Sequence, residues 1–148
     1  MKQKIIIGNW KNYLGHKESI VLARLLLSLV TSKRTKVMIS PNHLYLNEVN
    51  IILSKTNIEV ISQNLTSVES KSDTGGITSK NLKDIDINRS LIAHSETRIR
   101  EKEPQSILFE ISKMSFPFVL CFEEINQIQF DLLNNNFEII LAYEPVWA

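Results

Sequence analysis

Three positions in the sequence carry side chains suited to acid–base chemistry, and each follows a short apolar run. Glu144 comes shortly after such a run and is followed by the rigid residue Pro145. Because desolvation at the end of a buried strand raises the basicity of a carboxylate, a glutamate held there can abstract a proton next to a carbonyl. We interpret Glu144 as a candidate general base; the simpler alternative is a solvated or capping carboxylate.

His94 is the second candidate, because it ends an apolar run and opens a Ser-Glu turn that leads towards a helix. The positive end of that helix would disfavour the imidazolium form and keep the ring neutral. The alternative is a structural histidine whose hydrogen bonds are satisfied. His16 and His43 lack comparable neighbours, and we interpret both as solvated loop or helix-start residues.

Lys11 is the third candidate, a cation in the segment GNWKN that follows the first apolar run. A fixed positive charge there would supply the counter-charge for an anionic group. The alternative is an ordinary surface lysine. The three candidates are far apart in the sequence, so a shared site needs elements that make them converge.

Length and composition are those of one soluble globular domain, which we expect to cover residues 1–148. The chain has 43% hydrophobic and 22% charged residues, and 17 basic residues nearly balance 16 acidic ones. No basic stripe favours a nucleic-acid partner, and no apolar run approaches the roughly 20 residues that span a membrane. The single cysteine, Cys121, excludes an intramolecular disulfide and fits a reducing cytoplasm.

The chain alternates short apolar runs with amphipathic helical patterns. Six runs are almost continuously apolar, which is typical of parallel strands that are buried on both faces. These runs are residues 5–7, 37–39, 58–61, 91–93, 118–120 and 139–141. The helical patterns between them place apolar residues at Ile20, Val21, Leu25 and Leu29; at Leu46, Val49 and Leu53; at Ile107, Leu108, Ile111 and Met114 after Pro104; and at Ile128 and Leu132 before residues 134–136.

Repeated strand–helix units leave two architectures, an open doubly wound sheet or a closed barrel. The polar residues favour the barrel, because they fall at the carboxyl ends of the strands and would gather around one mouth. They are residues 9, 11, 63, 64, 94–96, 123, 124 and 144.

Four separated motifs resemble those of the triosephosphate isomerase family, in the same order and with similar spacing. They are GNWKN at residues 8–12, SQN at 62–64, AHSETR at 93–98 and AYEPVWA at 142–148. The resemblance implies an α/β fold of the (β/α)8 TIM-barrel family, here incomplete with about six parallel strands and their helices. It also implies the interconversion of D-glyceraldehyde 3-phosphate and dihydroxyacetone phosphate through an enediolate, in glycolysis and gluconeogenesis.

The resemblance gives the three candidates specific roles. Glu144 would be the base, His94 would polarise the substrate carbonyl, and Lys11 would bind the substrate electrostatically. Asn9 would hold Lys11 and contribute to substrate binding. Glu96 would pair with Lys11.

Further roles follow from the same resemblance. Ser95 would hydrogen-bond Glu144; a Ser-His-Glu hydrolase is a remote alternative, because adjacent residues at a strand end project differently. Thr74 and Gly75 match the tip of a loop that enters a neighbouring subunit, so a cytoplasmic homodimer is expected. No metal or organic cofactor is implied, because proton transfer between adjacent carbons needs only a base, an electrophile and the exclusion of water.

Three positions depart from the family pattern. Gly76 stands where the family usually has a glutamate, and Thr97 stands where it usually has an arginine. In the family, the side chains at those two positions pair at the dimer interface, so one polar contact of a dimer would be absent. Glu123 replaces a usual glycine and places a carboxylate near the mouth of the barrel.

In the family, AYEPVWA leads into a phosphate-gripping lid and two further strands. We therefore expect a chain that lacks the lid and the last two βα units and is inactive in isolation. Residues 4–8 and 138–143 would be apolar edges open to aggregation, swapping or pairing with another chain. Two hypotheses remain: an isomerase whose chain is a fragment or is completed by another chain, and a non-catalytic truncated relic or edge-strand interaction protein.

Overall fold

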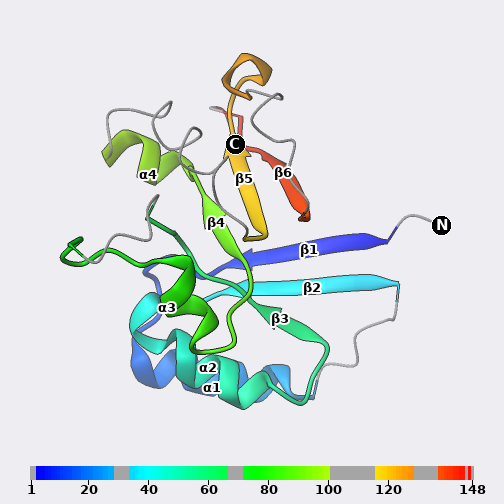
Figure 1. The fold of residues 1–148 in the computed structure, drawn as a ribbon. Coiled ribbons are helices and arrows are strands. Elements are labelled where there is room, and N and C mark those ends of the chain that lie inside the picture. The colour runs from blue at the N-terminus through cyan, green and yellow to red at the C-terminus, as the bar shows by residue number, and fades with distance from the viewer. Residues whose placement is uncertain are drawn as a thin grey trace. The chain divides into compact units, whose positions relative to one another are not determined.

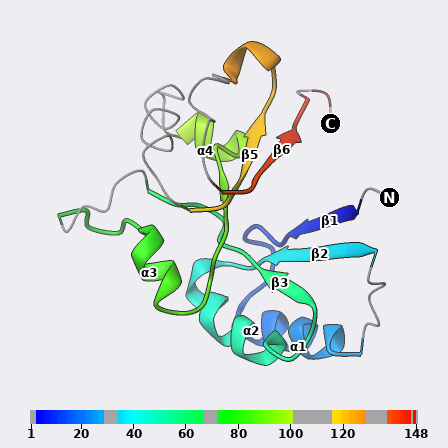
Figure 2. The same cartoon turned by 45° about the vertical axis from the view of Figure 1, so that its right-hand side comes forward.

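The computed structural model describes residues 3–28, 34–66, 72–100, 116–128, 137–145 and 147. The chain divides into two compact units, Met1–Gln63 with Asp84–Ile87, and Asn64–Lys83 with Asn88–Ala148. In its described residues each unit contains one three-stranded parallel sheet (Figures 1 and 2). The predicted six parallel strands are thus confirmed, while the expectation of a single domain stays a prediction.

The first unit is built from a sheet in the order β1-β2-β3. Its strands are β1 (Lys4–Asn9), β2 (Thr35–Ser40) and β3 (Ile58–Val60), and its helices are α1 (His16–Leu26), the short 3₁₀ helix η1 (His43–Tyr45) and α2 (Leu46–Leu53). The parallel register sets Asn9, the last residue of β1, opposite Ser40, the last residue of β2. The carboxyl ends of these two strands therefore lie next to each other.

Helix α2 packs as its sequence pattern predicts, because Leu46, Val49 and Leu53 are all buried. Helix α1 does not, because its buried residues are Ser19, Ile20 and Ala23, whereas Val21 is 57% exposed and Leu25 is also exposed. Helix α1 lies against α2, and we attribute its inward face to close helix packing at the small side chains of Ser19 and Ala23.

Both histidines outside the site begin helices, as predicted. His16 starts α1, and its Nε2 lies 2.7 Å from Oε2 of Glu48 on α2 at an exposed position. His43 starts η1, and its Nε2 lies 2.7 Å from the hydroxyl oxygen of Ser62. Because His43 is half-buried, it is less solvated than the sequence led us to expect.

The second unit is built from a sheet in the order β4-β5-β6. Its elements are α3 (Ser79–Lys83), β4 (Ser90–Ile92), α4 (Ser95–Arg100), β5 (Phe118–Phe122), the 3₁₀ helix η2 (Ile125–Gln127) and β6 (Ile139–Tyr143). The central strand β5 is almost wholly buried, as a strand with neighbours on both sides should be. At the amino-terminal end of the sheet, the buried Arg89 donates from its Nη2 to Oε2 of Glu138 at 2.6 Å.

The expectation of burial on both faces fails for the first and last strands, β1 and β6, whereas β3 and β4 are mostly buried. In β1, Ile6 is 57% exposed and Ile5 is also exposed, and in β6 the side chains of Leu141 and Tyr143 are exposed. Each of these strands pairs with one neighbour among the described residues, β1 with β2 and β6 with β5. Both strands are therefore the apolar edges that the sequence predicts.

Some predicted positions cannot be compared with the structure. Leu29, the helical pattern from Pro104 to Met114, Leu132, residues 134–136, and Val146 and Ala148 of the last motif lie outside the described residues. Ile128, predicted within a helix, instead follows η2 with extended backbone. Within the described residues, the helices are all too short or too polar to cross a membrane.

Candidate active site

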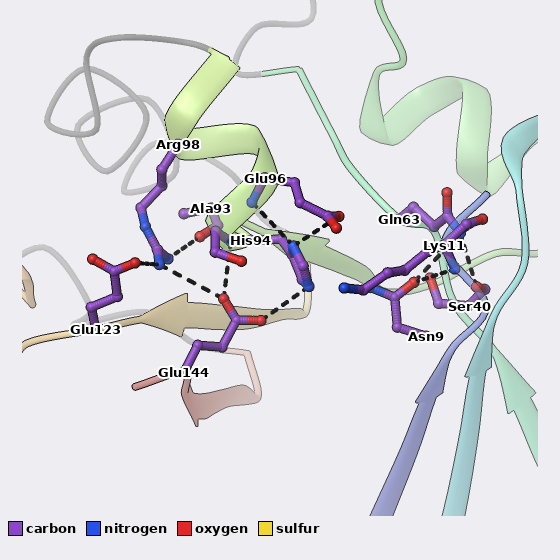
Figure 3. A network of polar contacts seen from close by, with 11 residues as sticks. Asn9, Lys11, Ser40, Gln63, Ala93, His94, Glu96, Arg98, Glu123 and Glu144 are labelled. Atoms are coloured by element: carbon purple, nitrogen blue, oxygen red, sulfur yellow. Dashed lines mark hydrogen bonds and ion pairs between the residues drawn. The ribbon is translucent and has the colours of Figure 1, made fainter. Parts of the chain in front are cut away.

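The predicted site residues fall into two groups, one in each unit, and both groups follow the carboxyl ends of parallel strands. We call them the lysine cluster (Asn9, Lys11, Ser40 and Gln63) and the glutamate cluster (His94, Ser95, Glu96, Arg98, Cys121, Glu123 and Glu144). Figure 3 shows most of these residues as sticks.

In the lysine cluster, the chain leaves β1 through a tight turn. The N–H of Trp10 donates to the carbonyl of Ser40 at 2.9 Å, and the N–H of Lys11 donates to Oδ1 of Asn9 at 2.9 Å. Lys11 has a φ of 49°, a left-handed conformation that costs a residue with a side chain about 1–3 kcal/mol. Such strain is kept where the surrounding contacts enforce it, and Asn9 is one of those contacts.

Gln63 supplies further contacts, and sequence reasoning gave it no role. Its Nε2 donates to the carbonyl oxygen of Lys11 at 2.8 Å and to that of Ser40 at 3.1 Å (Figure 3). It also lies 3.5 Å from Oδ1 of Asn9. The backbone of Lys11 is therefore held on both sides by neutral amides, from Asn9 at its N–H and from Gln63 at its carbonyl.

In the glutamate cluster, His94 stands where β4 turns into α4. Ala93 has a φ of 54°, which reverses the chain after the strand. The carbonyl oxygen of His94 then accepts from the N–H groups of Thr97 at 2.8 Å and Arg98 at 3.0 Å, so that His94 directly precedes α4 and accepts its first hydrogen bonds. The imidazole is thereby fixed at the amino-terminal end of a helix.

Glu144 directly follows β6, and its N–H continues the ladder to the carbonyl of Phe122 at 2.7 Å. Its side chain, 25% exposed, reaches the start of α4. There Oε2 accepts from the N–H of Ser95 at 2.9 Å, and Oε1 lies 3.1 Å from Nε2 of His94 (Figure 3). Ser95, the predicted partner of Glu144, thus contacts it through its backbone N–H.

The contacts of His94 indicate which ring nitrogen carries the proton. The N–H of Glu96 points at Nδ1 of His94 at 3.4 Å, so Nδ1 is an acceptor. A neutral ring then carries its proton on Nε2, which faces Glu144. The carboxylate of Glu96, which is exposed, lies 3.4 Å from the same Nδ1. A neutral imidazole with an Nε2–H group can donate a hydrogen bond to a substrate carbonyl.

Arg98 is a member of this cluster to which sequence reasoning assigned no function. Its side chain is 8% exposed, and Nη1 donates to the carbonyl oxygen of Ala93 and to that of Cys121 at 3.1 Å. Its Nη2 lies 2.9 Å from Oε1 of Glu123 and 3.7 Å from Oε2 of Glu144. Arg98 ends the AHSETR motif, so the signal was present in the sequence.

Cys121 is buried beside Glu144. Burial, the negative charge of Glu144 and a hydrogen bond to Glu144 together raise the pKa of its thiol to about 12, against the opposing effect of Arg98. The thiol is therefore protonated at neutral pH and donates towards the carboxylate. Cys121 cannot act as a thiolate nucleophile there.

Other predicted residues are placed as follows. Lys11 belongs to the first unit and Glu96 to the second, and their predicted pairing stays a prediction. Thr74 and Gly75 are exposed in a loop of the second unit, and Gly75 has a φ of 83° that favours glycine. Thr97 is buried, and a Cβ at Gly76 would lie 1.9 Å from Oδ2 of Asp73, so the loop fits a glycine there unless Asp73 moves.

Parallel strands that alternate with helices and carry acid–base residues at their carboxyl ends are features of α/β proteins, the (β/α)-barrel class among them. The family model of triosephosphate isomerase matches residues 4–148. The triosephosphate isomerase of Mycoplasma genitalium is 30% identical over all of this chain and 67% of its own length, and that of Flavobacterium psychrophilum is 31% identical over all of this chain and 68% of its own. The enzyme of the same name from Blochmanniella pennsylvanica is 31% identical, and the match covers 66% of it.

The chain therefore belongs to the triosephosphate isomerase family. It spans about two thirds of the length of these relatives. The family resemblance and the barrel class that the four motifs predict are confirmed.

Proposed function

We propose that the glutamate cluster catalyses the interconversion of D-glyceraldehyde 3-phosphate and dihydroxyacetone phosphate, although the sequence alone led us to expect an inactive isolated chain. The observation that carries this proposal is the pair formed by Glu144 and His94, whose Oε1 and Nε2 atoms lie 3.1 Å apart. This reaction needs a base and a hydrogen-bond donor that act on adjacent substrate atoms, and the pair supplies both. Family membership supports the choice of a phosphorylated triose as substrate.

In this proposal, the carboxylate of Glu144 removes a proton from the carbon next to the substrate carbonyl. The Nε2–H of His94 donates to the carbonyl oxygen and stabilises the negative charge that develops there, which gives the enediolate. Glu144, now protonated, then returns the proton to the former carbonyl carbon, while Nε2 of His94 gives its proton to the former carbonyl oxygen and takes the proton of the neighbouring hydroxyl group, so that the carbonyl moves by one carbon. The substrate would take the place of the present contact between Glu144 and His94, because both groups must turn from each other to the ligand.

We assign substrate binding to Lys11 and Asn9. A cation that faces the phosphate or the enediolate would stabilise the negative charge of the substrate. The strained backbone of Lys11, held by Asn9 and Gln63, supports this assignment, since strain of this kind gathers at functional sites.

The proposal extends to a cytoplasmic homodimer in which the loop with Thr74 and Gly75 contacts the second subunit. The exposure of both residues supports an intermolecular role. The measurement is sedimentation velocity with Thr74→Glu, which would convert dimer to monomer because it introduces a charge into the interface. An unchanged dimer, or a monomer already in the parent chain, would refute this part.

A coupled assay tests the enzymatic function. The purified chain is incubated with glyceraldehyde 3-phosphate, and dihydroxyacetone phosphate is detected through its reduction by an auxiliary dehydrogenase. Glu144→Gln, purified in parallel, reports the activity of contaminating host enzyme. Turnover in the parent chain that exceeds this control supports the proposal. Equal rates in two folded proteins would overturn it.

The second candidate function is an interaction through exposed strand edges. Ile5 and Ile6 of β1 and Leu141 and Tyr143 of β6 support it, because exposed apolar edge strands readily pair with another chain. Ile6→Lys would then abolish association in sedimentation experiments and leave any isomerase activity of the glutamate cluster unchanged. Loss of activity together with association would instead tie the edges to the enzyme.

A further inference from the structure

Glu123 is a carboxylate of the glutamate cluster that the proposed reaction does not use. It follows β5 directly, and its N–H donates to the side-chain oxygen of Gln127 at 2.9 Å, which fixes its backbone. Its side chain is about one third exposed and lies against Arg98. A carboxylate held by its own backbone contact and turned towards a buried guanidinium is a defined part of the local structure.

Arg98 connects Glu123 with the candidate base. The two Nη1 contacts, to the carbonyl oxygens of Ala93 and Cys121, anchor the guanidinium at the ends of β4 and β5. Nη2 then has two carboxylates within reach, Glu123 at 2.9 Å and Glu144 at 3.7 Å (Figure 3). The closer contact belongs to Glu123, so this carboxylate forms the main ion pair.

The balance of charge around Arg98 matters for the chemistry of Glu144. A guanidinium without a partner at such a distance stabilises the carboxylate and typically lowers its pKa by about 1–3 units. A base with a lower pKa accepts a proton less readily. Arg98 would therefore weaken Glu144 as a base if nothing else neutralised its charge.

We propose that Glu123 is a positioning residue that neutralises Arg98 and so preserves the basicity and the orientation of Glu144. Glu123 draws the guanidinium towards itself, so that the contacts of Glu144 are mainly those with the N–H of Ser95 and with Nε2 of His94. This inference rests on the proposed function only in its consequence for catalysis, because the electrostatic effect is a property of the cluster itself.

Every group that faces Glu144 within the described second unit enters the expected titration. The start of α4 contributes His94, the N–H of Ser95 and Arg98, and β5 contributes the protonated thiol of Cys121. Among these groups, Arg98 is the permanent positive charge. Removal of the Glu123 charge is therefore expected to act on Glu144 in one direction, towards a lower pKa.

The first test measures the titration of Glu144 by ¹³C NMR in protein labelled at the glutamate side-chain carbonyls. The signal is assigned by its absence in Glu144→Gln. In Glu123→Gln this signal is expected to titrate at lower pH than in the parent chain. The matched control is Glu124→Gln, which removes a neighbouring exposed carboxylate that contacts the amide of Asn126 at 3.0 Å instead of Arg98.

A double variant identifies Arg98 as the mediator. In an Arg98→Gln background, Glu123→Gln should have little effect on the pKa of Glu144, because the charge that Glu123 neutralises is gone. If buried Arg98→Gln does not fold, the comparison of Glu123→Gln with Glu124→Gln stands alone, because Arg98→Lys would keep the positive charge. No shift in Glu123→Gln, or the same shift in both single variants, would overturn the inference.

Activity provides a separate readout. In Glu123→Gln, kcat is expected to fall about threefold to tenfold, the acidic limb of its pH profile to move to lower pH, and KM to change little. A purely structural role for Glu123 would not move the pH profile. If the NMR shift appears while the parent chain shows no isomerase activity, the proposed function fails and the electrostatic inference stands. If activity is present without the shift, the electrostatic inference fails and the proposed function stands.

Discussion

The lysine cluster and the glutamate cluster hold their functional residues in different ways. Lys11 is fixed through its backbone, by the neutral amides of Asn9 and Gln63 and a φ of 49°. Glu144 is fixed through its side chain, by His94, the N–H of Ser95 and an arginine shared with Glu123. The difference teaches that a residue that supplies a fixed charge is held by its main chain, whereas a residue that exchanges protons is held by groups that respond to its charge.

The largest effect is expected from a substitution of His94 in the glutamate cluster. His94→Gln keeps a hydrogen-bond donor of similar reach but removes the imidazole, and kcat should fall about 10²–10⁴-fold because the donor to the substrate carbonyl is misplaced. Steady-state kinetics in both directions provide the measurement. The control is His16→Gln, which alters an exposed histidine of the other unit. A loss of activity equal in the two variants would refute the role of His94.

The second expected effect concerns the thiol that contacts Glu144. The pKa of Cys121 is raised from 9.0 to about 12. At pH 9 the thiolate should therefore make up about 10⁻³ of the folded molecules, a few hundredfold less than in the unfolded chain. Alkylation by iodoacetamide at pH 9, followed by mass spectrometry, should therefore be slower in the folded chain by at least that factor. Rapid stoichiometric alkylation of the native chain would contradict the neutral thiol.

The same raised pKa has a consequence for stability. The folded state binds the thiol proton more tightly than the unfolded state, so this contribution is fully present below pH 9 and is lost as the pH rises towards 12. Urea unfolding should show a steeper loss of stability over this interval in the parent chain than in Cys121→Ser.

The third expected effect breaks the lysine cluster. Gln63→Ala removes the donor to the carbonyl oxygens of Lys11 and Ser40, and KM should rise about tenfold because Lys11 is no longer held in place. Unlike Glu123→Gln, this variant should not move the pH profile of kcat, because the contacts that it removes are neutral. A displaced pH profile in Gln63→Ala would erase the distinction between the two clusters.

The smallest expected effect isolates the strain at Lys11. Glycine adopts a φ of 49° readily and alanine does not, so Lys11→Gly should have a free energy of unfolding about 1 kcal/mol higher than that of Lys11→Ala. Both variants lack the ammonium group and should be equally impaired in substrate binding. Equal stabilities in urea titrations would show that the left-handed backbone of Lys11 stores no strain.

Strand positions were predictable from the sequence, and the orientation of α1 was not. Residues 37–39 and 118–120 are continuously apolar because they form strands with a neighbour on each side, and this pattern is visible in one dimension. The face of α1 is set instead by the small residues Ser19 and Ala23, whose fit against α2 depends on the packed structure. Apolar periodicity alone therefore pointed to Val21 and Leu25.

The candidate site shows the same division. Motifs around Lys11, His94 and Glu144 identified the residues suited to the chemistry, because their residue types carry that information. The residues that hold them were harder to predict: Gln63 reaches the carbonyl of Lys11 across 52 positions, and Arg98 reaches that of Cys121 across 23. Such contacts depend on strand register and helix placement, which residue type does not reveal.

The central claim is that Glu144, paired with His94, moves a proton on a triose phosphate. The most direct measurement is proton NMR of dihydroxyacetone phosphate in D₂O, which records the loss of the proton signal from the carbon that Glu144 would deprotonate. It is made with the parent chain and with Glu144→Gln. The account predicts incorporation of solvent deuterium by the parent chain and a rate about 10²–10⁴-fold lower in the variant. Equal exchange rates in the two folded proteins would contradict it.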